Sequence, residues 1–388
     1  MKHAPRMAAL IAFLVFFSFH AAYSRSASSI LFVGTYTKGE SKGIYAFRYA
    51  AGSGKLTPLG LAAETVNPSF LAADSTNRFL YAVNETDEYK GQASGAVTAF
   101  EIHRETGRLV KLDQVASRGA GPCYISFDRT GKYVLVANYT GGNLAVFPLS
   151  ADGRIQEASA VEQDKGSFGP NQGRQERAHA HWVQVSADNR LAYVADLGLD
   201  RVLAYGFDAA KGEMGRGGSG EEGVFSATLA PGTGPRHAAF SADEKFMYVL
   251  GELDSTVTVF ENNGKGSWRS LEKTSALPEG FSGHNDAAEI AIHPSGKFLY
   301  TSNRGDDSIA VFRIDRSSGK LTLIQRLSSG GKTPRNFALD PAGRRLVAAN
   351  EDGGNIVEFT IDDSNGKLSA SGETARVPWP VCLVFVPE

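Results

Sequence analysis

The sequence has few cysteines and no excess of charge of either sign, and each shortage excludes a class of protein. Cys123 and Cys382 are the two cysteines among 388 residues. Their separation fits neither a metal site nor a redox pair. Both lie in apolar stretches, so we expect buried free thiols, with a structural disulfide as the alternative. The net charge is −2 with both signs interspersed, which argues against a surface that binds nucleic acid.

Long hydrophobic runs are also missing, except at the N-terminus. A positively charged start, 2–6, precedes an almost unbroken apolar stretch, 7–19, and small residues then surround Ser24. This pattern predicts an export signal peptide over 1–24 and a periplasmic or secreted mature protein. The alternative is an uncleaved anchor, for which the apolar stretch is short. No later segment is apolar enough to span a bilayer, so we expect no membrane association after signal removal.

Glycine, in contrast, is abundant, with 43 residues, as expected for short strands joined by tight turns. One unit recurs along the chain, and its first half consists of two apolar runs separated by turn residues such as Ser295-Gly296-Lys297. Each such half predicts a β-hairpin. The six complete hairpins are expected at 68–82, 122–137, 181–195, 234–249, 288–302 and 334–349.

A third apolar strand follows each hairpin, and a short fourth strand follows that. Four short strands in a repeat of roughly 45 to 60 residues are typical of a β-propeller blade. The third strand occurs seven times, and the remaining hairpin is divided between 379–386 and 30–34. We therefore predict an all-β fold, a seven-bladed β-propeller over 29–388. The N-terminal strand would pair with the C-terminal strand and close the ring, which removes exposed sheet edges.

The start of each first strand and the end of each second strand lie on the same face of the propeller. At equivalent positions on this face, the six complete units carry different residue types. With the units aligned at the last apolar residue of the first strand, one column lies four residues before it and another twelve residues after it. The first column holds Ser69, Cys123, His181, Arg236, Ala288 and Arg335. The second column holds Glu85, Tyr139, Leu197, Glu252, Arg304 and Glu351.

This variation predicts a ligand site, because a purely architectural repeat has no reason to differentiate equivalent positions. Four cations converging in a concave pocket are costly without an anion, so we expect a small anionic substrate. A solvated rim is the alternative. A metal pair at His179 and His181 is conceivable, since residues two apart on a strand share a side. No third ligand stands at a convincing spacing, so we expect neither a metal nor a cofactor.

Several short motifs along 30–388 occur in an order typical of one known family. They are FVGTYT at 32–37, NYTGGN at 138–143, RQ at 174–175, HAH at 179–181, DLGLDR at 196–201, GPRH at 234–237 and SNRG at 302–305. On these motifs the chain resembles the seven-bladed propeller lactonases, a family typified by bacterial 6-phosphogluconolactonase that includes the fungal carboxy-cis,cis-muconate cyclase.

The resemblance implies a lactonase that hydrolyses a sugar-acid lactone in the central funnel. The residues to which the family's chemistry is ascribed match His181, Arg236, Glu252 and Arg304. The residues expected to bind substrate are Arg174, His179, His237, Arg335, Glu85 and Tyr139. The export signal departs from the cytosolic family member, so an unphosphorylated aldonolactone and other acidic lactones are also candidate substrates.

Several alternatives stay open at this point. Either Glu252 or His181 would activate water as general base, while Arg236 and Arg304 would stabilise the oxyanion or bind an acidic group. A muconate-type lactonising cycloisomerase would use the same residues. A non-catalytic propeller of the cell envelope would bind without turnover. The expected partner is a small anionic or sugar-derived lactone, with no nucleic acid, and the expected state is a monomer.

Overall fold

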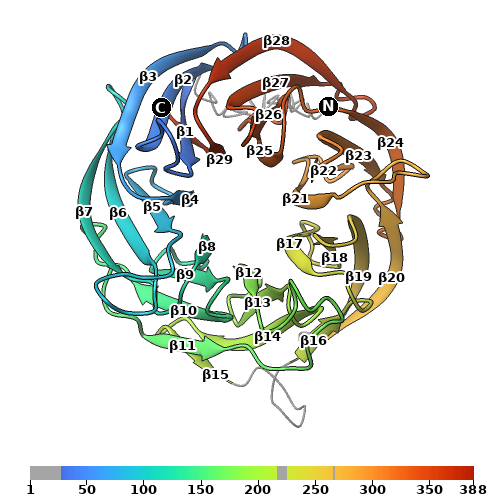
Figure 1. The fold of residues 1–388 in the computed structure, drawn as a ribbon, viewed down its shortest axis with the longest axis horizontal. Coiled ribbons are helices and arrows are strands. Elements are labelled where there is room, and N and C mark those ends of the chain that lie inside the picture. Colours follow the sequence, from blue (N-terminus) through green and yellow to red (C-terminus); the bar gives the residue numbers. More distant parts are fainter. Residues whose placement is uncertain (1–27, 216–224, 265–266) are drawn as a thin grey trace, which may run out of the picture.

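The computed structural model describes residues 28–215, 225–264 and 267–388. The predicted signal peptide, 1–24, lies outside these ranges. No helix long and apolar enough to cross a membrane occurs in them. The described residues form seven small antiparallel sheets arranged in a ring, as Figure 1 shows. The predicted all-β, seven-bladed β-propeller is therefore confirmed.

Each sheet is one blade, and its first strand is innermost (Figure 1). Blades 1 and 2 contain β4 (Pro68–Ala73), β5 (Phe79–Asn84), β6 (Ala96–His103) and β7 (Arg108–Ala116), then β8 (Pro122–Phe127), β9 (Tyr133–Asn138), β10 (Asn143–Pro148) and β11 (Ala160–Gln163). Blade 3 contains β12 (Ala180–Val185), β13 (Leu191–Asp196), β14 (Arg201–Asp208), β15 (Glu213–Gly215) and β16 (Phe225–Thr228).

The remaining blades complete the ring. Blades 4 and 5 contain β17 (Pro235–Phe240), β18 (Phe246–Gly251), β19 (Thr256–Gly264) and β20 (Ser267–Ser275), then β21 (Asp286–Ile292), β22 (Phe298–Arg304), β23 (Ser308–Ile314) and β24 (Leu321–Ser328). Blades 6 and 7 contain β25 (Pro334–Leu339), β26 (Arg345–Asn350), β27 (Asn355–Ile361) and β28 (Leu368–Arg376), then β29 (Pro380–Pro387), β1 (Ser28–Thr35), β2 (Gly43–Ala50) and β3 (Leu56–Glu64).

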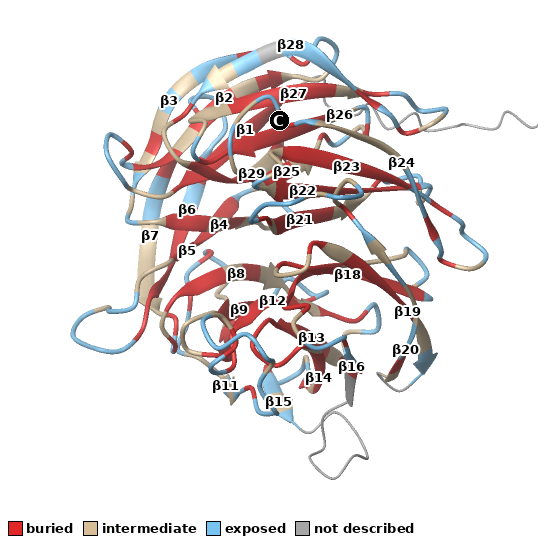
Figure 2. Ribbon diagram, turned by 45° about the vertical axis from the view of Figure 1, so that its right-hand side comes forward, coloured by how far each residue is buried: buried red, intermediate tan, exposed pale blue. Residues whose placement is uncertain are grey.

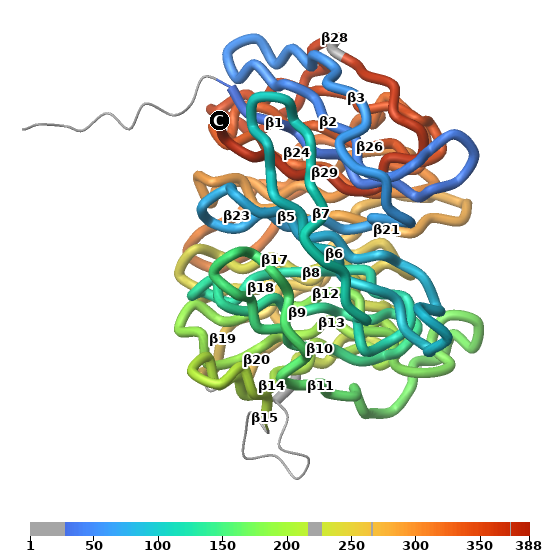
Figure 3. Tube along the Cα trace, turned by 90° about the vertical axis from the view of Figure 1, so that its left-hand side faces the viewer, coloured from blue at the N-terminus to red at the C-terminus, as the bar shows by residue number. Residues whose placement is uncertain are grey.

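Blade 7 is built from both ends of the described chain. Strand β1 pairs antiparallel with β29, for example Ile30 with Val386 and Leu31 with Phe385. The blue and red ends of the tube accordingly lie together in Figure 3. The predicted closure of the ring by N- and C-terminal strands is confirmed.

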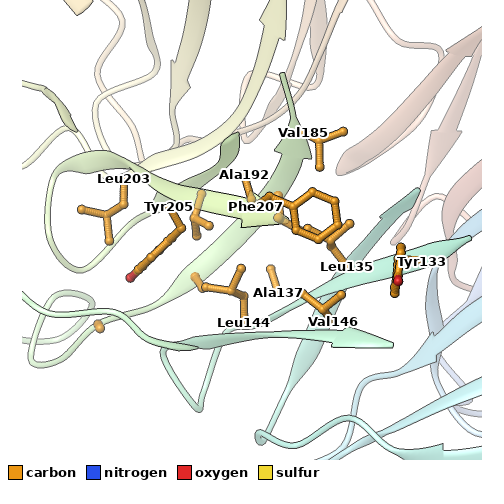
Figure 4. Close-up of a cluster of buried hydrophobic side chains, with 14 of the residues drawn as sticks. Tyr133, Leu135, Ala137, Leu144, Val146, Val185, Ala192, Leu203, Tyr205 and Phe207 are labelled. Carbon is orange, nitrogen blue, oxygen red and sulfur yellow. The ribbon is translucent and has the colours of Figure 1, made fainter. Parts of the chain in front are cut away.

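The hydrophobic core is divided among the contacts between neighbouring blades. The described residues form seven clusters of buried apolar side chains, and each cluster joins two adjacent blades. Between blades 2 and 3, Leu135 and Val146 pack against Ala192 and Leu203 (Figure 4). Burying one such Leu contributes about 1.5–3 kcal/mol. Inner strands such as β5 are buried throughout, whereas most residues of the outer β7 are exposed or of intermediate burial (Figure 2).

The hairpin turns between first and second strands are alike in blades 1, 2, 3, 4 and 6. In blade 2, Asp128 Oδ1 accepts hydrogen bonds from the backbone N–H groups of Lys132 (2.9 Å) and Tyr133 (3.0 Å). Gly131 supplies the positive φ of 70° that this turn requires. The side chains that take the place of Asp128 in other blades are Asp74, Ser186, Ser241 and Asp340.

A β-bulge interrupts the first strand of every blade at the opposite face. In blade 4, Pro235 pairs with Gly251 and His237 with Leu250, so Arg236 is the extra residue. The extra residues of the other blades are Ser69, Cys123, His181, Ala288 with Glu289, Arg335 and Val381. They include the whole first column of the repeat. A bulge re-aims a side chain, so this recurring bulge sets the direction of the site residues.

Candidate active site

A pocket of about 330 Å³ opens where the inner strands begin, and each of the seven blades or the loop leading into it contributes to its wall. This volume lies within the range of small-molecule sites, about 300–1,000 Å³. The lining residues are Tyr36, Glu85, Cys123, Tyr139, Arg174, His181, Glu252, Asp286, Arg304 and Arg335. Cys123, like Cys382, is a buried free thiol, as expected from the sequence.

Glu252 is the centre of the charged cluster. It follows β18, and only 3 % of its surface is exposed. Its Oε2 lies 2.9 Å from Arg236 Nε and 3.2 Å from Arg304 Nη2. Its Oε1 accepts a hydrogen bond from Arg174. Arginines from blade 4, from blade 5 and from the loop before blade 3 therefore meet at one carboxylate.

The charges in this cluster are fixed at neutral pH. Burial alone would raise the pKa of Glu252, but Arg304, Arg236 and Arg174 outweigh it and hold that pKa at about 2. Burial and the repulsion of Arg304 and Arg335 lower the pKa of Arg236 to about 10. Glu252 is thus an anion that partly neutralises the cations around it. Part of the anionic charge that these arginines need is therefore supplied by the protein itself.

His181 lines the pocket next to this cluster as an uncharged imidazole. Burial and the charge of Arg236 lower its pKa well below the usual value. Its Nε2 lies 4.0 Å from Glu252 Oε2, which is too far for a direct hydrogen bond. Its Nδ1 has no hydrogen-bond partner among the described residues. The imidazole is therefore uncharged at neutral pH, and its Nδ1 is not engaged by another described group.

The wall on the side of blades 6, 7 and 1 has a different character. The guanidinium of Arg335 lies 5.1 Å from the centre of the Tyr36 ring, and the Tyr36 hydroxyl donates to Glu85 at 3.0 Å. Burial alone would lower the pKa of Arg335, but Tyr36, Glu85 and Glu351 outweigh it and raise that pKa. Arg335 thus shares its surroundings with two carboxylates.

Cationic and anionic side chains are equal in number along the pocket wall. The three arginines are Arg174, Arg304 and Arg335, and the three carboxylates are Glu85, Glu252 and Asp286. Arg236 and Glu351 add one charge of each sign nearby. The pocket is therefore polar and close to neutral.

The loop before blade 3 contributes one of these cations. Gln175 fixes the loop, because its side chain donates to the backbone oxygen of Leu197 at 2.9 Å. Its neighbour Arg174 then reaches Glu252 and also lies 3.5 Å from Asp286. A loop inserted between two blades thus supplies one of the three arginines that contact Glu252.

The structure brings together the four residues predicted to carry the chemistry, His181, Arg236, Glu252 and Arg304. Of the six predicted to bind substrate, the four that line the pocket are Arg174, Arg335, Glu85 and Tyr139.

His179 and His237 are not part of the pocket wall. His179 stacks on Tyr139 with ring centres 4.4 Å apart, and its Nδ1 lies 3.0 Å from the Tyr139 backbone oxygen. His179 precedes β12 and His181 is the extra residue of its bulge, so the two-residue alternation of a regular strand does not apply to this pair.

Sequence reasoning missed Tyr36 and Asp286 in the wall. Tyr36 directly follows β1, as Glu85 follows β5, so it occupies the second column in the divided blade. Extending the alignment of the repeat across the chain ends would have found it. Asp286 begins β21 and lies outside both columns, so the repeat carried no signal for it.

Fold and pocket define this chain as a closed seven-bladed β-propeller with a buried charged cluster where its inner strands begin. The chain belongs to the lactonase family of seven-bladed β-propellers, since residues 30–385 match the family described as "Lactonase, 7-bladed beta-propeller".

Two relatives illustrate the range of this family. A protein of Bacillus subtilis named 6-phosphogluconolactonase is 37 % identical over 356 residues, covering 92 % of this chain and 97 % of its own length. The solved structure of the periplasmic gluconolactonase of Pseudomonas aeruginosa has a TM-score of 0.84 and 34 % identity, covering 92 % of this chain and 99 % of its own. The resemblance read from the sequence motifs is confirmed.

Proposed function

We propose that the protein hydrolyses an uncharged sugar lactone in this pocket. The observation that carries the proposal is the neutral His181 beside a carboxylate that is already paired with three arginines. Lactone hydrolysis needs a group that removes a proton from water and a cation that stabilises the oxyanion. The two kinds of group stand side by side here.

His181 is the general base in this proposal. Glu252, with a pKa of about 2, is too weak a base to remove a proton from water. The 4.0 Å between His181 Nε2 and Glu252 Oε2 leaves room for a water molecule that donates to both. His181 would take one proton from this water as its oxygen attacks the lactone carbonyl carbon. The same proton would then pass to the ring oxygen as the carbon–oxygen bond of the lactone breaks.

Arg304 is the proposed oxyanion stabiliser. It lines the pocket, and its Nε donates to the backbone oxygen of Asp286 at 3.2 Å, so its side chain is held in place before substrate binds. Arg236 lies behind Glu252 with only 3 % of its surface exposed. We assign Arg236 the role of holding Glu252, and through it the water, since it has little contact with the pocket itself.

The balance of charge along the wall supports a substrate without a phosphate. A phosphate dianion near Arg335 would also face Glu85 and Glu351, and repulsion by these carboxylates offsets its attraction to one guanidinium. Sugar hydroxyls, in contrast, can donate to Glu85 and Asp286 and accept from Arg335. The name of the Pseudomonas aeruginosa relative, a periplasmic gluconolactonase, agrees with this substrate class and with export of the protein to the periplasm.

A comparison of substrates tests the proposal. The purified protein is given glucono-1,5-lactone, the 6-phosphate of that lactone and a carboxymuconate, and the products are followed by NMR. We expect hydrolysis of the neutral lactone with the highest kcat/KM, and its loss in the variant His181→Asn. Turnover of carboxymuconate alone would indicate a cycloisomerase, and binding of a lactone without turnover would indicate a binding protein. Either result would overturn the proposal.

A further inference from the structure

A second ring of side chains lies directly below the pocket, at the position that follows each bulge. Its members are Phe70, Tyr124, Trp182, His237, Asn336 and Cys382, with Glu289, the second bulge residue, in blade 5. Blades 1 to 3 contribute aromatic rings, and Phe70 and Tyr124 are in contact with ring centres 4.1 Å apart. Blades 4 to 6 contribute polar groups. The ring is therefore divided into an aromatic half and a polar half.

The polar half is a continuous chain of hydrogen bonds that begins at Arg236. Arg236 Nη1 lies 3.3 Å from His237 Nε2, and His237 Nδ1 lies 2.9 Å from Glu289 Oε1. The Asn336 amide donates to Glu289 Oε2, and the backbone N–H of Leu383 donates to Asn336 Oδ1 at 2.9 Å. Leu383 belongs to β29, the strand that closes the ring. The chain thus runs from the charged cluster to the closing strand through blades 5 and 6.

This arrangement fixes one protonation pattern. Arg236 is a donor only, so His237 Nε2 must accept and its Nδ1 must carry the proton that is shared with Glu289. Glu289 then accepts from His237, from Asn336 and from the Ile290 N–H at 3.0 Å. Burial alone would raise the pKa of Glu289, but His237 and Arg236 outweigh it and lower that pKa. Glu289 is therefore a carboxylate to which each of these three neighbours donates.

We propose that His237, Glu289 and Asn336 are positioning residues that fix the side chain of Arg236, and through it Glu252, from the closing strand β29. Arg236 uses Nη1 for His237 and for the backbone oxygen of Ala288, while its Nε lies 2.9 Å from Glu252 Oε2 as an ion pair. These contacts of Nη1 fix the orientation of the guanidinium plane. The functional part of this inference rests on the proposed hydrolysis, but the hydrogen-bond pattern does not.

The first test is the variant Glu289→Gln and its complement. The glutamine turns an NH₂ group toward the NH₂ group of Asn336, so one contact of the chain becomes repulsive. We expect kcat to fall about 10- to 100-fold with KM nearly unchanged, because the reacting groups are displaced while the pocket wall stays intact. Adding Asn336→Asp gives the new amide an acceptor again, and the introduced carboxylate can still accept from the Leu383 N–H. The double variant E289Q/N336D should recover most of the lost kcat.

Phe70→Leu is the matched control in the aromatic half of the same ring. It should lower Tm by a few degrees and leave kcat within about twofold. If E289Q keeps the wild-type kcat, or if the double variant restores Tm but not kcat, the positioning role is excluded. If the wild-type protein hydrolyses no lactone, the proposed function fails on its own.

The second test does not depend on activity. In ¹⁵N-histidine-labelled protein, the resonances of His237 should show a proton on Nδ1 and none on Nε2 at neutral pH. This pattern should persist in E289Q, because Arg236 still donates to Nε2 and the oxygen of the glutamine amide still accepts from Nδ1–H. Protonation of His237 at Nε2 in the wild-type protein would overturn the proposed chain of hydrogen bonds, whatever the enzyme does.

Discussion

The two faces of the propeller treat equivalent positions in opposite ways. At the hairpin turns, Asp128 and its counterparts Asp74 and Asp340 accept the same backbone N–H groups in the same geometry. At the pocket face, the bulge recurs in every blade, but its extra residue ranges from Ser69 to Arg236. The backbone is thus repeated on both faces, while the side chains change only between such acceptors as Asp and Ser at these turns and vary far more widely at the pocket. This difference separates what the fold requires from what a ligand requires.

Glu252→Gln should cause the largest loss of activity and stability among the changes at the pocket face. The change leaves Arg236, Arg304 and Arg174 without their common anion, and unpaired buried charges cost about 3–5 kcal/mol. We expect kcat to fall about 10³-fold, since the preorganised charges around the substrate are lost. Steady-state kinetics and thermal unfolding measure the two effects.

Sulfate provides the control for this variant. If Glu252 is the anion that the arginines need, sulfate should raise the Tm of Glu252→Gln more than that of the wild-type protein. Sodium chloride at equal ionic strength separates this binding from general screening. Equal responses of the two proteins to sulfate would show that the cluster is not neutralised by Glu252.

His181→Asn should remove the base and leave the cluster intact. We expect kcat to fall about 10²-fold or more, with little change in Tm, because His181 makes no direct hydrogen bond to Glu252. Tyr139→Phe, a change in the same wall, removes only the hydroxyl that accepts from Arg174 at 3.5 Å and should lower kcat far less than His181→Asn. A fully active His181→Asn variant would show that another group acts as the base.

The pH dependence of kcat/KM tests the same assignment without mutation. The base must be unprotonated, and the pKa of His181 lies well below 6.5, so the acid limb should fall below that pH. Arg236 must be protonated, and its pKa is about 10, so activity should decline as pH rises through about 10. Rates are corrected for the alkaline hydrolysis of lactone without enzyme. A midpoint above pH 7 on the acid side would contradict a neutral His181.

Asp128→Ala should destabilise one hairpin turn on the opposite face and leave the pocket unaffected. The change removes acceptors from the backbone N–H groups of Thr130, Lys132 and Tyr133. We expect a loss of about 1–3 kcal/mol in the free energy of unfolding, with kcat unchanged. Asp128→Asn, which keeps one oxygen acceptor, should lose less. Denaturant unfolding and kinetics of the two variants give the comparison.

The fold could be predicted from the sequence because its information is repetitive. Hairpins such as 234–249 recur at a regular period, and the incomplete copies at 30–34 and 379–386 require each other. The four residues gathered at the cluster could be predicted for a related reason. The two variable columns contain His181, Arg236, Glu252 and Arg304 among their twelve residues, and the family resemblance singles out these four.

The contacts themselves could not be predicted from the repeat. Which arginine meets Glu252 depends on distances between side chains of different blades, and a column records only one side chain per blade. The bulge that turns His181 but not His179 into the pocket also leaves no local sequence signal. The pairing of Glu252 with these arginines was therefore not predictable from the repeat.

The smallest expected effect is that of Glu85, a carboxylate in the pocket wall near Arg335. Glu85 accepts from Tyr36, lies on the pocket wall and is half-buried, while Glu105 is exposed in the turn between β6 and β7 on the opposite face. Glu85→Gln removes a charge that repels phosphate. The ratio of kcat/KM for the 6-phosphate of gluconolactone to that for gluconolactone should therefore rise about three- to fivefold, the effect of one partly solvated charge pair.

Glu105→Gln should leave this ratio unchanged, because water and salt screen its charge from the pocket. If both variants shift the ratio equally, the effect belongs to net charge and not to the wall beside Arg335. A wild-type protein that already prefers the phosphorylated lactone would show that Arg335 outweighs Glu85 and Glu351 in selecting the substrate.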